Sequence, residues 1–78
     1  MKALVVIDMQ NDFMPGGPLG VAGGTEIIQG INDIRGEYDY VCMTRDWHPK
    51  DHCSFASASG CAPYTVVSGE MRWPDHCI

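Results

Sequence analysis

The stretch Ala3-Leu4-Val5-Val6-Ile7-Asp8 decides the fold, because an unbroken apolar run, rich in β-branched residues, leads directly into a carboxylate. A continuous apolar run of this length is typical of a strand buried on both faces, as in a parallel sheet. Residues 38–44 predict a second strand of the same kind, and it too is followed by an acid, Asp46. The two runs together indicate neighbouring strands of one sheet.

The residues between these runs predict a loop and then a helix. Gly and Pro punctuate residues 11–24, which indicates a loop. Residues 25–35 place their isoleucines on one helical stripe, and Gly36 suits the end of that helix. Strand, helix and strand form a right-handed βαβ unit, in which sites lie outside the carboxyl ends of the strands. We therefore expect Asp8 and Asp46 to face a shared crevice.

The remaining residues, 47–78, are expected to be mostly loop. Residues 54–60 are small and polar, and residues 64–67 predict a short strand. There is no internal repeat and no linker-like segment, so residues 1–78 are interpreted as belonging to one domain.

Composition excludes several classes of function. The net charge is −5 with only five Lys and Arg, so the basic cluster that phosphate backbones require is missing. Nucleic acid and anionic membrane are therefore not expected as partners. The apolar run before Asp8 is too short for a signal peptide or a membrane span, which predicts a cytoplasmic protein. The four cysteines lack a C-x-x-C pair and are expected to be thiols, with Cys42 and Cys77 in the interior.

A candidate metal site is formed by Asp46-Trp47-His48-Pro49 and the later Trp73-Pro74-Asp75-His76. Residues two apart on an extended chain point to one side, so Asp46 and His48 can reach one ion. Mixed carboxylate and imidazole ligands suit zinc, manganese or iron(II), and three ligands leave positions for water or substrate. His76 is the expected third ligand, and His52 is either a further ligand or a residue at the rim. The alternative is a turn in which Asp46 caps backbone amides and His48 is solvated.

Asp8 also has two interpretations, a turn-capping acid or a general base. Gln10 and Asn11 beside it can hydrogen-bond to hold the loop. Phe13 and Trp73 are aromatic residues in predicted loops, where they either pack or form walls for a flat ring substrate.

Three segments together resemble the nicotinamidase/pyrazinamidase branch of the isochorismatase-like hydrolases. They are residues 3–13, residues 44–49 with His52-x-Ser54-Phe55, and Trp73-Pro74-Asp75-His76-Cys77. They occur in order and with fitting spacing over essentially the whole chain. The resemblance implies that residues 1–78 are the N-terminal portion of a single hydrolase domain of the α/β class. They would form the βαβ part of a doubly wound, Rossmann-like parallel sheet.

The resemblance also implies an activity, the hydrolysis of nicotinamide to nicotinate and ammonia in NAD metabolism and pyridine nucleotide salvage. It implies a divalent metal, zinc first with iron or manganese as alternatives, whose ligands are Asp46, His48 and His76, with His52 an additional ligand in some members. By the same resemblance, Asp8 is the acid/base of a catalytic triad, and Phe13 and Trp73 flank the pyridine ring.

The chain departs from this family in one respect that bears on catalysis. The triad also needs a lysine and a nucleophilic cysteine downstream of the last metal ligand, and Lys2, Lys50 and Cys77 do not match those places. The chain alone is therefore also interpreted as a non-catalytic metal-binding or interaction fragment. A metal-free isochorismatase-type hydrolase with another substrate is a further alternative. The candidate metal ligands Asp46, His48 and His76 argue against it.

A lone βαβ unit has a physical consequence. It exposes a sheet edge and the apolar faces that further helices would cover. We therefore expect the missing C-terminal portion, a partner chain or a second copy to cover that surface.

Overall fold

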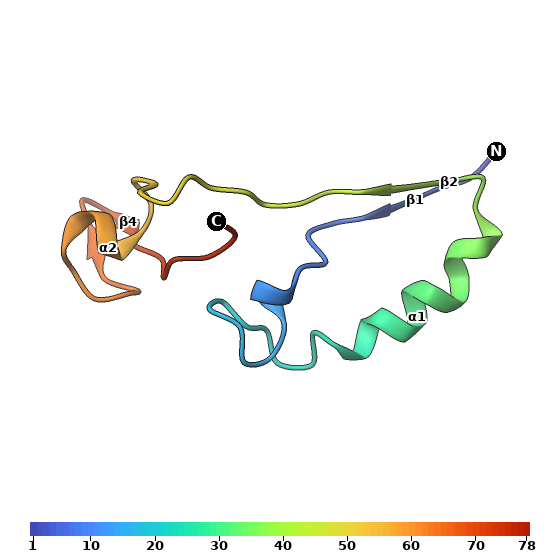
Figure 1. Cartoon of the computed structure of the whole chain (residues 1–78), viewed down its shortest axis with the longest axis horizontal. Helices are drawn as coiled ribbons and strands as arrows, with labels where there is room; N and C mark the ends of the chain where they lie inside the picture. The colour runs from blue at the N-terminus through green and yellow to red at the C-terminus, as the bar shows by residue number, and fades with distance from the viewer. The chain divides into compact units, whose positions relative to one another are not determined.

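The computed structural model describes residues 1–78, which form two compact units, Met1–Asp46 and Trp47–Ile78 (Figure 1). The first unit contains most of the regular structure, and the second is largely turns around short elements. Neither unit contains a helix with the length and apolar character needed to cross a membrane.

The first unit is a βαβ unit with a parallel sheet, as the sequence predicts. Strand β1 (Ala3–Val6) is followed by the short 3-10 helix η1 (Asn11–Phe13), helix α1 (Glu26–Ile34), a second 3-10 turn η2 (Arg35–Glu37) and strand β2 (Tyr40–Met43). The two strands lie side by side and parallel, with Ala3 opposite Tyr40 and Val6 opposite Met43 (Figure 1). The fold class is therefore α/β.

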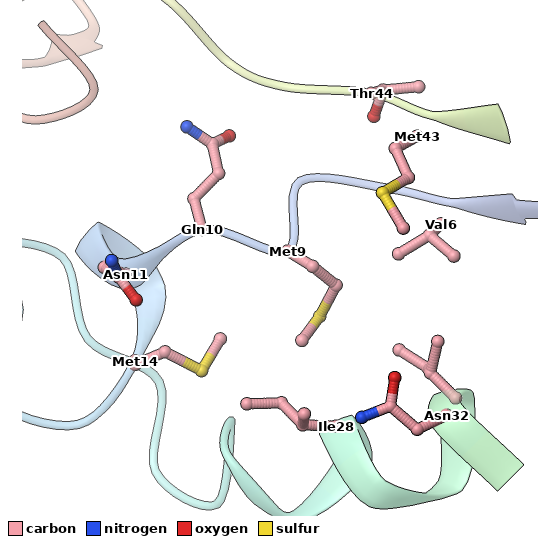
Figure 2. Close-up of a pocket in the computed structure, with 10 residues that line it drawn as sticks. Val6, Met9, Gln10, Asn11, Met14, Ile28, Asn32, Met43 and Thr44 are labelled. Carbon is pink, nitrogen blue, oxygen red and sulfur yellow. The ribbon is translucent and has the colours of Figure 1, made fainter.

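Helix α1 faces one side of this sheet across a cavity of about 240 Å³. Figure 2 shows the side chains of Met9, Met14 and Ile28 directed into the space between strands and helix. Unbranched Met side chains suit such an irregular gap. Val6, which lines the cavity from β1, is the one buried residue of the two strands, so the core of this unit is thin.

The expectation that the strands are buried on both faces is wrong for this structure. Residues directly opposite in a parallel pair point to the same side, so Val5 and Cys42 share the face that turns away from α1. Val5 is 54% exposed and Cys42 is exposed as well. The physical reason is that the sheet has only two strands and a single covering helix. The exposed apolar face expected for a lone βαβ unit is therefore present.

The second unit is built from helix α2 (Ala56–Ser59) and a hairpin of β3 (Val66–Val67) and β4 (Glu70–Met71). The hairpin turns at Ser68 and Gly69, which both have positive φ angles, as a tight hairpin turn of type I′ requires. The short strand expected in residues 64–67 is confirmed in its last two residues. Helix α2 lies in residues 54–60, where the sequence predicts a loop.

Candidate metal centre

Asp46 follows β2, and its main chain is fixed by Gln10 from the loop after β1. The Asp46 N–H donates to Gln10 Oε1 at 2.7 Å, and Gln10 Nε2 donates to the Asp46 carbonyl oxygen at 3.0 Å. Both contacts use main-chain groups of Asp46, so neither occupies its carboxylate. The expectation that Gln10 hydrogen-bonds to hold the loop after β1 is therefore confirmed.

His48 and His76 are brought together by their own main chains. The His48 N–H donates to the Cys77 carbonyl oxygen at 2.7 Å, which lays the two histidine segments alongside each other. The two imidazole centroids lie 4.9 Å apart, with the rings inclined at 62°. Cys77 is buried, as expected, and has a φ of 52°, a conformation uncommon outside glycine. This backbone geometry places two imidazoles beside one another although 28 positions separate them in sequence.

His76 has its ring orientation and tautomer set by a backbone carbonyl. Its Nδ1 lies 2.8 Å from the Pro74 carbonyl oxygen, which can only accept a hydrogen bond. The proton of the neutral ring is therefore on Nδ1, and Nε2 is the nitrogen with the lone pair. Metal-binding histidines commonly show this arrangement, with the other ring nitrogen donating to a carbonyl or carboxylate.

Asp46, His48 and His76 form a three-residue cluster in which one ligand atom from each lies within 4.8 Å of the others. Asp46 is only two residues from His48, so the chain between them limits how far apart they can lie. Ligand atoms bound at roughly 2.0–2.2 Å to one ion are at most about 4 Å apart, so small side-chain rotations would close the cluster. One carboxylate and two imidazoles make a donor set that fits zinc, manganese or iron(II). The residues present therefore fit a divalent metal.

His52 lies next to this cluster but is not part of it. Its ring centroid is 4.7 Å from that of His48, edge to face. The Ser54 N–H donates to His52 Nδ1 at 3.1 Å, and the Ser54 hydroxyl oxygen is 2.7 Å from the same atom. An Nδ1 that accepts leaves the proton of the neutral ring on Nε2, so that nitrogen has no lone pair for a metal. This geometry favours the rim interpretation, and the ligand role of His52 stays a prediction.

Phe55 is a residue of the site that the sequence analysis named within a segment of the family resemblance but to which it gave no role. It is 0% exposed, and its ring centroid lies 5.2 Å from that of His48, 5.7 Å from that of His52 and 5.4 Å from that of His76. Backbone bonds on either side of it, Ala56 N–H to the Trp73 carbonyl and Trp73 N–H to the Ser54 carbonyl, join the two segments. The signal that could have indicated its burial is a single aromatic residue within a segment of small polar residues.

Thr44 holds Asp8, and the sequence analysis gave Thr44 no role. The Asp8 N–H donates to the Thr44 hydroxyl oxygen at 3.1 Å, and that hydroxyl donates to Asp8 Oδ1 at 3.0 Å. Asp8 has a φ of 52°, in the left-handed region that Asp visits more readily than most residues but at a cost. The two bonds to Thr44 compensate for that strained backbone and orient the carboxylate.

The two predicted ring-flanking residues belong to different units. Phe13 ends η1 in the first unit, and Trp73 precedes Pro74 in the second. Trp73 is 38% exposed and packs its ring edgewise against Tyr64, with centroids 6.2 Å apart. Packing explains at least one contact of Trp73, and the flanking of a substrate ring by these two residues stays a prediction.

Comparison with known proteins identifies what this chain is similar to. No family model matches it. It is 43% identical to the nicotinamidase of Acinetobacter baylyi over 97% of this chain and 38% of that relative, and 41% identical to the nicotinamidase of Escherichia coli over 99% of this chain and 40% of that relative. The chain therefore spans about two-fifths of the length of these relatives.

Solved structures give the same result. A nicotinamidase and pyrazinamidase of Acinetobacter baumanii matches with a TM-score of 0.84 at 44% identity, covering 96% of this chain and 39% of that one. A yeast nicotinamidase bound to the inhibitor nicotinaldehyde matches with a TM-score of 0.83 at 38% identity, covering 100% and 44%. A pyrazinamidase of Pyrococcus horikoshii in complex with zinc matches with a TM-score of 0.67 at 40% identity, covering 96% and 38%.

Proposed function

We propose that this chain, a homologue of nicotinamidases over nearly all of its length, is the metal-binding and acid/base portion of a nicotinamidase-type amidohydrolase. The reaction is hydrolysis of nicotinamide to nicotinate and ammonia. One observation carries the proposal: Asp46, His48 and His76 present a three-ligand cluster within 4.8 Å in a chain homologous to nicotinamidases. Residues 1–78 would then be the N-terminal portion of a single hydrolase domain.

The proposed metal ligands are Asp46, His48 and His76, and zinc is the proposed ion, with iron or manganese as alternatives. The donor set and the zinc complex of a structural neighbour support zinc. A divalent metal bound there would supply positive charge that holds water and the ring nitrogen of the substrate. The tautomer of His76, set by the Pro74 carbonyl, presents Nε2 to that ion. His52 is proposed as a rim residue that becomes an additional ligand only in the other tautomer, with the proton on Nδ1 and the bond from the Ser54 N–H broken.

Asp8 is proposed as the group that moves protons. Its carboxylate would take the proton of a cysteine thiol, whose sulfur attacks the carboxamide carbon. The same proton would go to the departing ammonia as the carbon–nitrogen bond breaks, and Asp8 would then help water to hydrolyse the thioester. The proposal assigns that cysteine, and a lysine of the same triad, to positions outside these 78 residues. Phe13 and Trp73 are proposed to flank the pyridine ring.

Ammonia release from nicotinamide tests this function in protein that contains this chain. We expect turnover that is lost on chelation of metal and restored by zinc, iron or manganese. Asp46→Asn and Asp8→Asn should each lower kcat by roughly 100-fold or more, since one removes a charged ligand and the other the proton carrier. Asp75→Asn is the matched control, because Asp75 accepts a hydrogen bond from Ser57 and lies outside the cluster. Turnover that is unchanged in Asp8→Asn would contradict the assignment.

A second candidate function is a non-catalytic metal-binding or interaction fragment of the same fold. One observation favours it: the sheet face that carries Val5 and Tyr40 is exposed and could contact a partner. This candidate would be supported over the first if the form of the protein that cells make binds metal but releases no ammonia from nicotinamide. In either case we propose that the rest of the domain or a partner chain covers the exposed face.

A further inference from the structure

We propose that Gln10 is a positioning residue for the metal site, whose carboxamide holds the main chain of Asp46 so that the Asp46 carboxylate meets His48 and His76. The inference rests on the metal site proposed above and adds a residue to it. The two bonds from Gln10 go to main-chain groups of Asp46, so through them Gln10 would act on the metal site by way of Asp46.

The contact between Gln10 and Asp46 continues the pairing of the two strands after their backbone ladder has ended. The regular register stops at Val6 and Met43, and the last main-chain bond runs from the Thr44 N–H to the Val6 carbonyl oxygen at 2.9 Å. Beyond that point the two chains diverge, and the Gln10 side chain bridges 36 positions in sequence to reach Asp46. Figure 2 shows its amide directed toward the chain that follows β2.

The chemistry of the contact is specific to a carboxamide. Its oxygen accepts from the N–H of Asp46 and its nitrogen donates to the carbonyl of the same residue, as a neighbouring strand would. Two such bonds to one residue restrict the dihedral angles on both sides of its Cα atom. They therefore fix the direction in which the Asp46 side chain leaves the backbone. No other natural side chain of this length offers one donor and one acceptor in this geometry.

The contact is part-buried, so water competes for these main-chain groups less than at an open surface. In metal sites, partners that orient a ligand without touching the metal are worth roughly 10- to 100-fold in metal affinity. The alternative is that Gln10 only braces the loop after β1. In that case its loss would lower the stability of the chain in the absence of metal and leave the affinity for metal unchanged.

The test is a titration of the purified full chain with zinc against a competing chelator, with far-ultraviolet circular dichroism of the metal-free protein alongside. Gln10→Met keeps the length of the side chain and removes both bonds, and it should weaken zinc binding by roughly 10- to 100-fold at a temperature where the protein is folded. Gln10→Glu keeps the acceptor for the Asp46 N–H but loses the donor, so its affinity should lie between those of Gln10→Met and the unaltered chain.

Gln29→Met is the matched control. The Gln29 amide donates to Asp33 Oδ1 at 2.7 Å on the exposed side of α1, away from the cluster, so its zinc affinity should be that of the unaltered chain. Zinc affinity that is equal in Gln10→Met and the unaltered chain would overturn the role of Gln10 while leaving the metal site standing. An unaltered chain that binds no zinc would instead overturn the metal site, and this inference with it. If Gln10→Met does not fold, Gln10→Glu decides by the same comparison.

Discussion

Thr44 and Asp8 exchange two hydrogen bonds across the ends of the two parallel strands. The hydroxyl of Thr44 accepts from the Asp8 N–H and donates to Asp8 Oδ1, while Asp8 sits at a φ of 52°. A single hydroxyl therefore both stabilises the left-handed backbone of the proposed proton carrier and orients its carboxylate.

Removal of that hydroxyl should impair turnover more than it impairs folding. Thr44→Val keeps the shape of the side chain and removes a hydrogen bond to a charged group, which is worth roughly 1.5–3 kcal/mol, so kcat for nicotinamide should fall about 10- to 100-fold. Thr44→Ser retains the hydroxyl and should recover most of the activity. Thr65→Val is the control, because the Thr65 hydroxyl donates to the Ala62 carbonyl in the second unit. Equal activity in Thr44→Val and Thr65→Val would show that Thr44 does not orient Asp8.

Phe55 should support both the second unit and the imidazoles packed on it. Its ring is fully buried and contacts three histidine rings, so Phe55→Ala should destabilise the fold by roughly 3–5 kcal/mol through lost contacts and a cavity. Thermal denaturation followed by circular dichroism measures this effect. Tyr64→Ala removes an aromatic side chain that is 54% exposed and should cost much less. A Phe55→Ala melting curve that coincides with that of Tyr64→Ala would contradict this account of the core.

The uncovered face of the sheet should make the isolated chain self-associate. Val5 and Tyr40 lie on this face and are 54% and 53% exposed, and each strand has only one partner. Apolar faces and open strand edges of this kind pair with other chains. Sedimentation velocity of the isolated 78-residue chain should therefore show species larger than a monomer that grow with concentration. A monomer with a cooperative melting transition independent of concentration would contradict this prediction.

The elements of the first unit were predictable because their signals are local. An unbroken apolar run, one isoleucine stripe and Gly36 indicate strand, helix and helix end without reference to anything distant. The structure shortens the expected helix from residues 25–35 to Glu26–Ile34 and ends both strands before the acids. The sequence also predicted that Asp46, His48 and His76 would form one cluster, from the two-residue spacing of Asp46 and His48 and from the residue types around His76.

What the sequence did not reveal depends on contacts between distant residues. The bonds of Gln10 to Asp46 and of Thr44 to Asp8 each span 36 positions and follow no periodic pattern. Helix α2 was missed because its residues are small and polar and form no apolar stripe. The burial of Phe55 and Ala56 holds this helix in position. The apolar pattern around Val5 is that of a strand buried on both faces in a larger sheet, so the exposure of Val5 followed from the lone βαβ topology and not from its local sequence.

The most direct test of the central claim is the stoichiometry and affinity of zinc binding in the unaltered chain and in His76→Ala. We expect one zinc per chain in the unaltered protein. In His76→Ala, the affinity for zinc should fall by about 100-fold or more, because a metal ligand is removed. The Asp75→Asn control, one residue away and outside the cluster, should bind as the unaltered chain does. No bound zinc in the unaltered chain, or the same affinity in His76→Ala, would contradict the account.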